Sequence, residues 1–226
     1  MTWISVKRRG LVKGKYYNIK SISKQKGYKF VNRFLEKITR NFIKENFKFT
    51  KVSYELSYEH GELQLHSTLF PSIFKEVDVC FREIRTKRFG GHRGDMGRID
   101  YYTEVEGQQI LIEVKHHKIN PNAKSFRILN NKWSELIEQI IKLDSDSIRL
   151  GLMVVPFRLR YILGKYEEFR WWKNEEIKNF GFHAFQKVDP LPDWCTIIQI
   201  RDSDLFPERK NEDFYYPAIL LMAFKM

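Results

Sequence analysis

The sequence predicts an α/β domain with a central mixed β-sheet flanked by helices, and three observations lead to this prediction. The chain has 226 residues, of which 42% are hydrophobic, and this is enough to build a substantial core. Two alternating segments near the middle of the chain predict a β-hairpin. A helical pattern followed by the apolar run RLGLMVVPF predicts a crossover back into the same sheet, because such runs are typical of strands covered on both faces.

The first half of the chain is expected to supply one helix and several short strands. Apolar residues recur at helical spacing from Tyr28 to Phe47, which predicts a first helix whose apolar face packs on the sheet. Residues 51–58 and 61–68 alternate as two short strands around a His60-Gly61 turn, and residues 76–85 fit a further strand or extended segment. A polar, glycine-rich loop is then expected at residues 87–97.

The hairpin and the crossover follow this loop. Ile99–Val105 and Gln109–His116 are the expected strands, and the turn Glu106-Gly107-Gln108 contains a glycine that can adopt a positive φ. Ser134–Leu143 is the expected helix, and residues 149–157 are the strand that returns to the sheet.

The remainder predicts a helical stretch near residues 161–179, a strand at residues 195–201 and an apolar terminal segment. The chain is therefore divided into a basic N-terminal segment, residues 1–27, and a single α/β domain, residues 28–226.

The basic charge is concentrated at the N-terminal end. The net charge is +12, and residues 1–35 contain ten basic residues and no acid, so only +2 remains for all other residues. Aromatic residues interleave with these cations, a combination that suits a polyanion through phosphate neutralisation and base stacking. The alternative is a lysine-rich surface that only maintains solubility. Nucleic acid is the expected partner, and the candidate ligands at this end are Lys7, Arg8, Arg9, Lys13 and Lys15.

Neither secretion nor membrane insertion is expected. The N-terminus has no apolar core behind its charges, and the terminal run YYPAILLMAF is far shorter than the ~20 residues of a spanning helix. The two cysteines, Cys80 and Cys195, show neither a disulfide framework nor zinc-ligand spacing, which favours a reducing, cytoplasmic setting.

Three charged residues of the predicted hairpin form a candidate active site. The pattern acid-any-lysine occurs three times in the chain, about as often as chance predicts, so only its setting is informative. Glu113-Val114-Lys115 directly follows an apolar strand, and its two charged side chains share one face by period-two geometry. Pairing across the hairpin is expected to bring Asp100 within about 5–8 Å of that face.

This arrangement predicts metal-dependent hydrolysis of phosphodiesters. Two adjacent carboxylates repel each other unless a proton or cation lies between them, and hard oxygen donors are what Mg²⁺ or Mn²⁺ takes. Lys115 is placed to position or deprotonate an attacking water, or to stabilise charge on the phosphorane. The alternative is that Lys115 simply pairs with Glu113 or Asp100 on an exposed strand face.

These residues resemble the motif of the PD-(D/E)XK nuclease superfamily, which has the restriction endonuclease-like fold. Arg98-Ile99-Asp100 matches the first acid of the motif with isoleucine in place of proline, and Glu113-Val114-Lys115 matches the second half. The resemblance covers about residues 98–157. It implies that Asp100, Glu113 and the Val114 carbonyl hold the divalent ion, with Lys115 at the nucleophilic water.

Two further residues follow from the resemblance. Many members carry a glutamine on the helix after the motif, and Gln139 occupies the predicted helix here and borders its apolar stripe. Members often have a glutamate on the first helix that reaches the metal, and both Glu36 and Glu45 are open candidates.

The loop at residues 85–98 is a candidate substrate loop, because it combines several cations with four glycines. The alternative is a flexible surface connection. Trp171 and Trp172 fit a helix core or interface better than a base-stacking role. The candidate phosphate ligands of the loop are Lys87, Arg88, Arg93 and Arg98.

The expected function is that of a divalent-metal-dependent endonuclease acting on DNA, with cleavage of RNA left open. Cutting both strands usually needs two sites, which suggests a homodimer or a larger nuclease assembly. The alternatives are a catalytically inactive nucleic-acid-binding module, or a DNA-binding subunit of a larger restriction, transposition or repair assembly.

Overall fold

The computed structural model describes residues 2–22, 28–53, 55–59, 61–87, 96–160, 173–200 and 214–226. These residues form four helices and ten strands. In chain order the elements are β1 (Ile4–Arg8), β2 (Leu11–Lys20), α1 (Tyr28–Ser53), α2 (Glu62–Phe74), β3 (Val79–Lys87), β4 (Met96–Val105), β5 (Gln108–His116), α3 (Ala123–Ile141), β6 (Ile148–Pro156), β7 (Leu159–Arg160), α4 (Asn174–Gln186), β8 (Trp194–Ile200), β9 (Phe214–Tyr215) and β10 (Ile219–Lys225).

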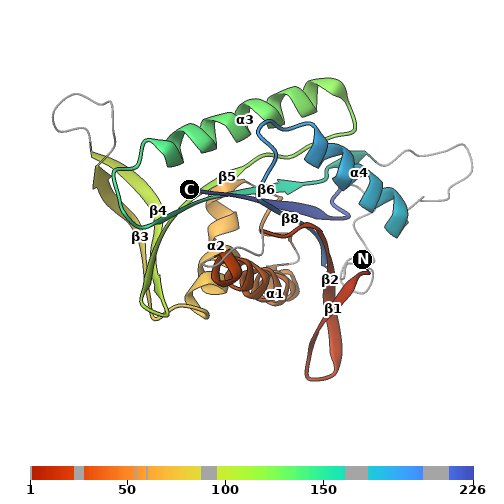
Figure 1. The fold of residues 1–226 in the computed structure, drawn as a ribbon. Coiled ribbons are helices and arrows are strands. Elements are labelled where there is room, and N and C mark those ends of the chain that lie inside the picture. The colour runs from red at the N-terminus through yellow and green to blue at the C-terminus, as the bar shows by residue number, and fades with distance from the viewer. Residues whose placement is uncertain are drawn as a thin grey trace, which may run out of the picture.

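Eight of these strands form one mixed sheet in the order β1-β2-β8-β10-β6-β5-β4-β3. Strands β5 and β6 run parallel, and the other neighbours in this sheet are antiparallel. Figure 1 shows α1 and α2 on one face of the sheet and α3 and α4 on the other. The predicted α/β architecture, a central mixed sheet flanked by helices, is confirmed.

Each face of the sheet has its own hydrophobic core. On β5, Ile110, Ile112 and Val114 join the core beneath α1 and α2, whereas Leu111 joins the core beneath α3 and α4. Successive strand side chains point to opposite faces. The odd-numbered residues of β5, which include Glu113 and Lys115, therefore face α3.

The central hairpin and the crossover form as predicted. Strands β4 and β5 pair antiparallel around the turn at Glu106 and Gly107, which have φ values of 50° and 73°. Helix α3 begins earlier than predicted, at Ala123, because Asn122 caps it: Asn122 Oδ1 accepts a hydrogen bond from the Ser125 N–H at 2.8 Å. Strand β6 then returns parallel to β5.

The prediction of two strands at residues 51–58 and 61–68 is wrong. Helix α1 continues to Ser53, and α2 begins at Glu62. The run ELQLHSTL alternates, but Leu65, Leu69 and Ile73 also recur every four residues, and all three are buried. The helical period is the one that buries them together, so packing on the sheet decides in favour of the helix.

Two other segments differ from the sequence-based prediction at their ends. Helix α4 begins at Asn174 and continues to Gln186, beyond the predicted residue 179. Residues 161–172, which include Trp171 and Trp172, lie outside the described residues. The apolar terminal segment is β10, which pairs with both β6 and β8 in the sheet.

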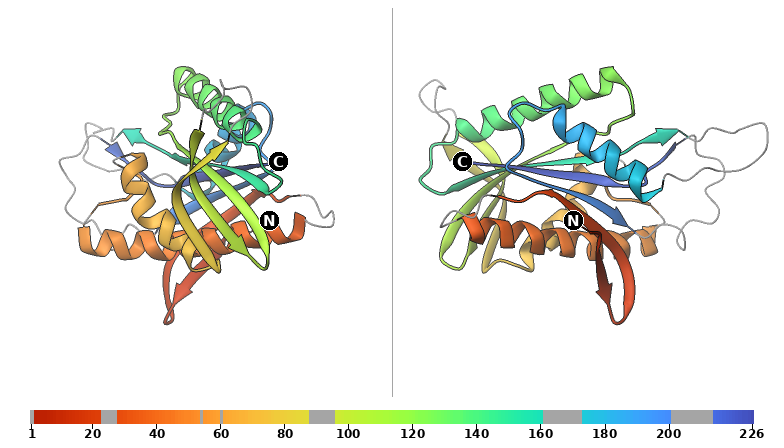
Figure 2. Two further views of the ribbon diagram at one scale, coloured as in Figure 1. Left: turned by 90° about the vertical axis from the view of Figure 1, so that its left-hand side faces the viewer. Right: turned by 45° about the vertical axis from the view of Figure 1, so that its right-hand side comes forward.

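The basic N-terminal segment contributes the hairpin of β1 and β2 to the edge of the same sheet. Strand β2 pairs with β8, and Figure 2 shows the hairpin projecting past α1. Gly14 allows this close approach, since a Cβ atom there would lie 2.4 Å from Gln199 O and 2.8 Å from Ile43 Cγ2. The hairpin is therefore packed tightly against β8 and α1.

No helix within the described ranges combines the length and the apolar composition that crossing a bilayer requires.

A pair of alanine substitutions tests the helix at residues 62–74. An alternating strand would place Leu63 and Leu69 on the same face, but in α2 Leu69 is fully buried and Leu63 is 77% exposed. We expect Leu69→Ala to lower the free energy of unfolding by about 2–5 kcal/mol. Leu63→Ala should change it by less than about 0.5 kcal/mol. Urea denaturation measures both, and equal losses would contradict the helix.

Candidate functional site

Asp100 lies where β4 leaves regular pairing with both of its neighbours. The register of β4 with β5 ends at the pair Tyr101↔Ile112, and the Val114 N–H then donates to Asp100 Oδ2 at 2.7 Å. On the other side of β4, the pairing with β3 skips Glu83, whose φ is 54°. The Asp100 carboxylate thus takes the place of a backbone acceptor at the end of the ladder.

Glu113 and Lys115 occupy the same face of β5, as predicted from their spacing. Glu113 is 6% exposed and lies beside Gly151 of β6, while Lys115 lies beside Met153 and is half-buried. The hydrogen bond from the Val114 N–H to Asp100 Oδ2 places the Asp100 carboxylate beside the β5 backbone between Glu113 and Lys115. The hairpin therefore brings its two acids and the lysine together at the end of β5.

Gly151 keeps helix α3 close to this part of the sheet. A Cβ atom at Gly151 would lie 3.0 Å from Leu136 Cγ and 3.3 Å from Ile140 Cγ1. Because Gly151 is the β6 neighbour of Glu113, the same close packing covers the glutamate and removes it from bulk water. A carboxylate so placed needs compensating charge or hydrogen bonds.

Glu62 is a third carboxylate of the site, which the sequence did not reveal. It is the first residue of α2, and burial of its carboxyl raises its pKa above the usual value although the residue as a whole keeps solvent contact. The negative charge of Asp100 also raises this pKa, while the Lys115 charge and the His116 backbone N–H lower it. Glu62 of α2 therefore lies within electrostatic range of Asp100 and Lys115.

His66 ties α2 to β4 one turn after Glu62. Its Nδ1 shares a short hydrogen bond with the Tyr101 hydroxyl, and the two rings meet edge to face at 5.4 Å between centroids. Burial lowers the pKa of His66, although the nearby Asp100 charge opposes this, and burial raises the pKa of Tyr101. This neutral pair fixes the helix that carries Glu62 against the strand that carries Asp100.

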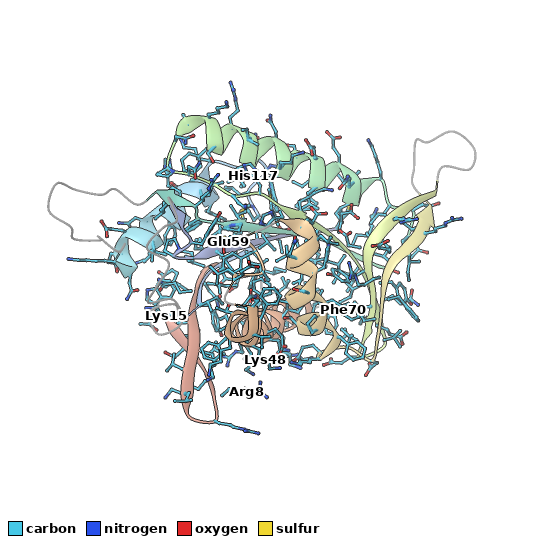
Figure 3. The ribbon with its side chains drawn as sticks, turned by 180° about the vertical axis from the view of Figure 1, so that it is seen from behind. Arg8, Lys15, Lys48, Glu59, Phe70 and His117 are labelled. Carbon is cyan, nitrogen blue, oxygen red and sulfur yellow. The ribbon has the colours of Figure 1, made fainter. Side chains whose placement is uncertain are left out.

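His116 anchors the segment before α2 to the end of β5. Its ring lies 2.9 Å from the Tyr58 carbonyl through Nε2, and burial lowers its pKa to about 4. His116 is therefore neutral at pH 7 and donates this hydrogen bond. Figure 3 shows Glu59 and His117, which neighbour the site, between the α1 and α3 layers.

Lys132 is the α3 side chain that lies within electrostatic range of the site. Its positive charge lowers the pKa of both Glu62 and His117, although burial has the larger effect on each. Gln139 lies two turns further along α3, and its Oε1 is buried without a hydrogen-bond partner among the described residues. The described contacts connect Gln139 to neither Asp100 nor Glu113.

The two glutamates of α1 considered from the sequence are engaged elsewhere. Glu36 Oε1 accepts a hydrogen bond from Asn32 Nδ2 at 3.3 Å. Burial would raise the pKa of Glu45, but hydrogen bonds and charges from Lys48 and Lys75 outweigh it, so this pKa is lowered. Glu45 is thus held in ion pairs on α1 and α2.

The basic residues of the hairpin divide into two groups. Lys7, Arg8 and Arg9 are exposed near its turn. Lys13 is 8% exposed, with its ammonium 4.1 Å from the centre of the Phe47 ring. Lys15 donates to Asn174 Oδ1 at 2.7 Å, and burial lowers its pKa.

The predicted substrate loop lies mostly outside the described residues, because its residues 88–95, including Arg88 and Arg93, fall there. Lys87 is the last residue of β3, and Arg98, in β4, pairs with Glu83 at 3.1 Å while remaining exposed.

The donor set fits a hard divalent cation in its chemistry. Asp100, Glu113 and Glu62 offer carboxylate oxygens, and the repulsion between Asp100 and Glu62 is what such an ion relieves. Among the described residues, no three His, Cys, Asp or Glu side chains already lie close enough together to hold a metal ion. Comparison with protein-family models, curated proteins and solved structures finds no match to this chain.

Substituting Glu62 tests its placement beside Asp100. A raised folded-state pKa means that ionised Glu62 destabilises the fold, so the wild type loses stability as pH rises from about 4.5 through the raised value. Glu62→Gln removes this loss. We expect it to be more stable than wild type at pH 7, by less than about 1 kcal/mol because the residue keeps solvent contact, and to lose this advantage near pH 4.

Urea denaturation between pH 4 and pH 8 measures the difference. Glu138→Gln, an exposed glutamate of α3, is the control and should follow the wild-type pH dependence. A Glu62→Gln profile parallel to wild type would show that the pKa of Glu62 is not raised in the folded protein.

Proposed function

We propose that this protein is a divalent-metal-dependent nuclease that hydrolyses phosphodiester bonds in DNA. One observation carries the proposal: the Asp100 carboxylate is fixed on the N–H of Val114, the residue between Glu113 and Lys115 in β5. The order β4, β5, α3, β6 also agrees with the arrangement of acid strand, turn, acid-any-lysine strand, helix and strand that the PD-(D/E)XK resemblance implies.

Four groups are proposed to hold the ion. Asp100, Glu113 and Glu62 supply carboxylate oxygens. The Val114 N–H points toward Asp100 and, because the N–H and C=O of one strand residue point to the same side, so does its carbonyl. A bound Mg²⁺ or Mn²⁺ would supply Lewis-acid polarisation of a phosphoryl oxygen and a lowered water pKa.

Lys115 is proposed to act on the attacking water. It follows Glu113 by two residues, and its positive charge lowers the pKa of Glu62 at the start of α2. Its ammonium can donate hydrogen bonds to the water and to the phosphate oxygens. As negative charge develops on the phosphoryl group, this fixed cation stabilises the transition state more than the ground state.

The projecting hairpin is the proposed substrate clamp. Lys7, Arg8 and Arg9 are exposed near its turn, where they can neutralise phosphates without leaving the fold. Arg98 lies in the same strand as Asp100 and is exposed, so it is the proposed phosphate contact beside the site. Cleavage of both strands would then use two copies of the chain, or a larger assembly.

Metal binding gives a test that does not depend on cleavage. We expect Mn²⁺ to raise the Tm of the wild type, because an ion that binds only the folded state at 100 times its Kd stabilises it by about 2.7 kcal/mol. Asp100→Asn and Glu62→Gln should lose most of this increase, which differential scanning fluorimetry measures. Asp144→Asn, an exposed aspartate after α3, should keep it. An equal increase in all four proteins would place the ion elsewhere.

Cleavage tests the function itself. We expect supercoiled plasmid and linear duplex DNA to be cut in Mg²⁺ or Mn²⁺ and left intact in EDTA. Asp100→Asn, Glu113→Gln and Lys115→Met should each lower the rate at least about 100-fold, because each removes a charge that acts in the transition state. The measurement is the initial rate on gels, with Asp144→Asn as the matched control.

Two outcomes would contradict the proposal. Cleavage that persists in Asp100→Asn would show that the activity belongs to another site. DNA binding without cleavage in either metal, and equally strong in Asp100→Asn, would favour a nucleic-acid-binding module without chemistry.

A further inference from the structure

Helix α1 carries an uninterrupted row of cations along its outer face. Seven basic residues recur at spacings of three or four, so at 100° per residue they fall within a sector of about 100°. The row covers 22 residue steps and is about 33 Å long. Its members are Lys29, Arg33, Lys37, Arg40, Lys44, Lys48 and Lys51.

The opposite side of α1 is fixed in the core. Val31, Leu35, Ile38 and Phe42 are fully buried against the sheet. Rotation of the helix would expose these residues, so the row of cations is held toward solvent. Its geometry is therefore rigid over the whole length of the helix.

This row carries more positive charge than its neighbours neutralise. Lys29, Arg40, Lys44 and Lys51 form no ion pair with any described acid, and like charges three or four residues apart on a helix repel each other. The remaining three are paired: Arg33 with Glu106 at 2.7 Å, Lys37 with Glu76 at 3.2 Å, and Lys48 with Glu45 at 2.8 Å.

The hairpin of β1 and β2 continues the same basic face. Lys13 of β2 and Lys51 of α1 both lie over the ring of Phe47, at 4.1 Å and 5.3 Å from its centre. The Arg40 guanidinium lies 5.6 Å from the centre of the Tyr16 ring. Strand and helix are therefore joined through their cationic side chains.

The net positive charge is concentrated in the part of the sequence that contains this face. Residues 1–53, which include β1, β2 and α1, contain 15 basic and 2 acidic residues, while residues 54–226 contain 25 basic and 26 acidic residues. Charge that served only solubility would be dispersed with both signs mixed. Segregation of the entire excess points instead to a polyanionic partner.

We propose that α1 and the β1–β2 hairpin form a surface that binds the backbone of duplex DNA, separate from the candidate catalytic site. The row of cations is straight, and its 33 Å length is close to one turn of B-DNA, about 34–36 Å. A projecting two-stranded ribbon such as the hairpin fits the major groove. The large apolar side chain that α1 exposes is Val52, not an aromatic ring, so α1 offers phosphate contacts rather than base stacking.

The surface and the site lie on different parts of the molecule. In Figure 3, Arg8 and Lys48 lie along the lower side, whereas Glu59 and His117, beside the site, lie above them between the helix layers. DNA binding at α1 therefore does not require Asp100, Glu113 or Lys115. The proposed DNA-binding surface can be correct even if the protein has no nuclease activity.

A triple substitution tests the surface. Arg40→Gln, Lys44→Gln and Lys51→Gln together remove three cations without an acidic partner from the row. The control combines Lys124→Gln, Lys142→Gln and Lys187→Gln, which removes the same charge from exposed positions on or next to α3 and α4. Fluorescence anisotropy of a labelled 30-base-pair duplex in EDTA, at several salt concentrations, measures binding while cleavage is off. Circular dichroism confirms that both triple variants are folded.

We expect the α1 variant to bind at least about tenfold more weakly. The slope of log K against log salt should be smaller by as much as about 2.7, or about 0.9 for each phosphate that the variant no longer neutralises. The control and Asp100→Asn should bind within about twofold of wild type.

Equal weakening in the α1 variant and the control would overturn the proposal, because it would show that only net charge matters. An equal loss of binding to a single strand of the same sequence would overturn the assignment to duplex DNA. If only the nuclease proposal is wrong, the wild type binds the duplex through α1 as expected but cuts no DNA in Mg²⁺ or Mn²⁺.

Discussion

The hydrogen bond from the Val114 N–H to the Asp100 carboxylate is the constraint on which the candidate site depends. It replaces a backbone bond at the end of the β4–β5 ladder, so the carboxylate becomes part of the sheet itself. Val114 lies between Glu113 and Lys115, which share the other face of β5, so this bond holds the Asp100 carboxylate next to both residues along the strand. The positions of three charged groups therefore follow from one pairing, because a shift by a single residue would turn Glu113 to the other face.

This dependence explains which parts of the site could be predicted from the sequence. Asp100, Glu113 and Lys115 belong to one hairpin, whose strands and turn are local features with a clear period. Glu62 was missed because it lies 38 residues before Asp100, in a run where strand and helix periods both fit. The sequence pattern predicts strands there instead of α2, which leaves Glu36 and Glu45 as the candidate helix glutamates. The contact of Glu45 with Lys75 crosses two helices and has no signal in the sequence.

The fold shows the same division between local and long-range information. The hairpin was predicted with errors of at most three residues at the ends of its strands. The β5–α3–β6 crossover was predicted in type and order, but its helix begins 11 residues earlier than predicted. The terminal segment was only recognised as apolar, although β10 lies in the sheet between β6 and β8. Its neighbours come from distant parts of the chain, so its place is decided by burial on both faces rather than by its own pattern. The N-terminal cations are a similar case, since their charge is readable but their assembly with α1 depends on Gly14 and the packing of β2.

Helix α1 links the two charged regions of the molecule. It packs against β2 on one side and against α2 on the other, so the helix that carries the row of cations also supports the helix that begins with Glu62. The two regions have opposite electrostatic requirements: the site holds acids that repel each other, and the outer face holds cations that do the same. The two regions lie on different parts of the molecule, which keeps the row of cations away from the acids of the site. This separation leaves the acids free for the proposed divalent ion and the lysines for the proposed phosphate contacts, because packed hydrophobic side chains fill the space between α1 and the sheet.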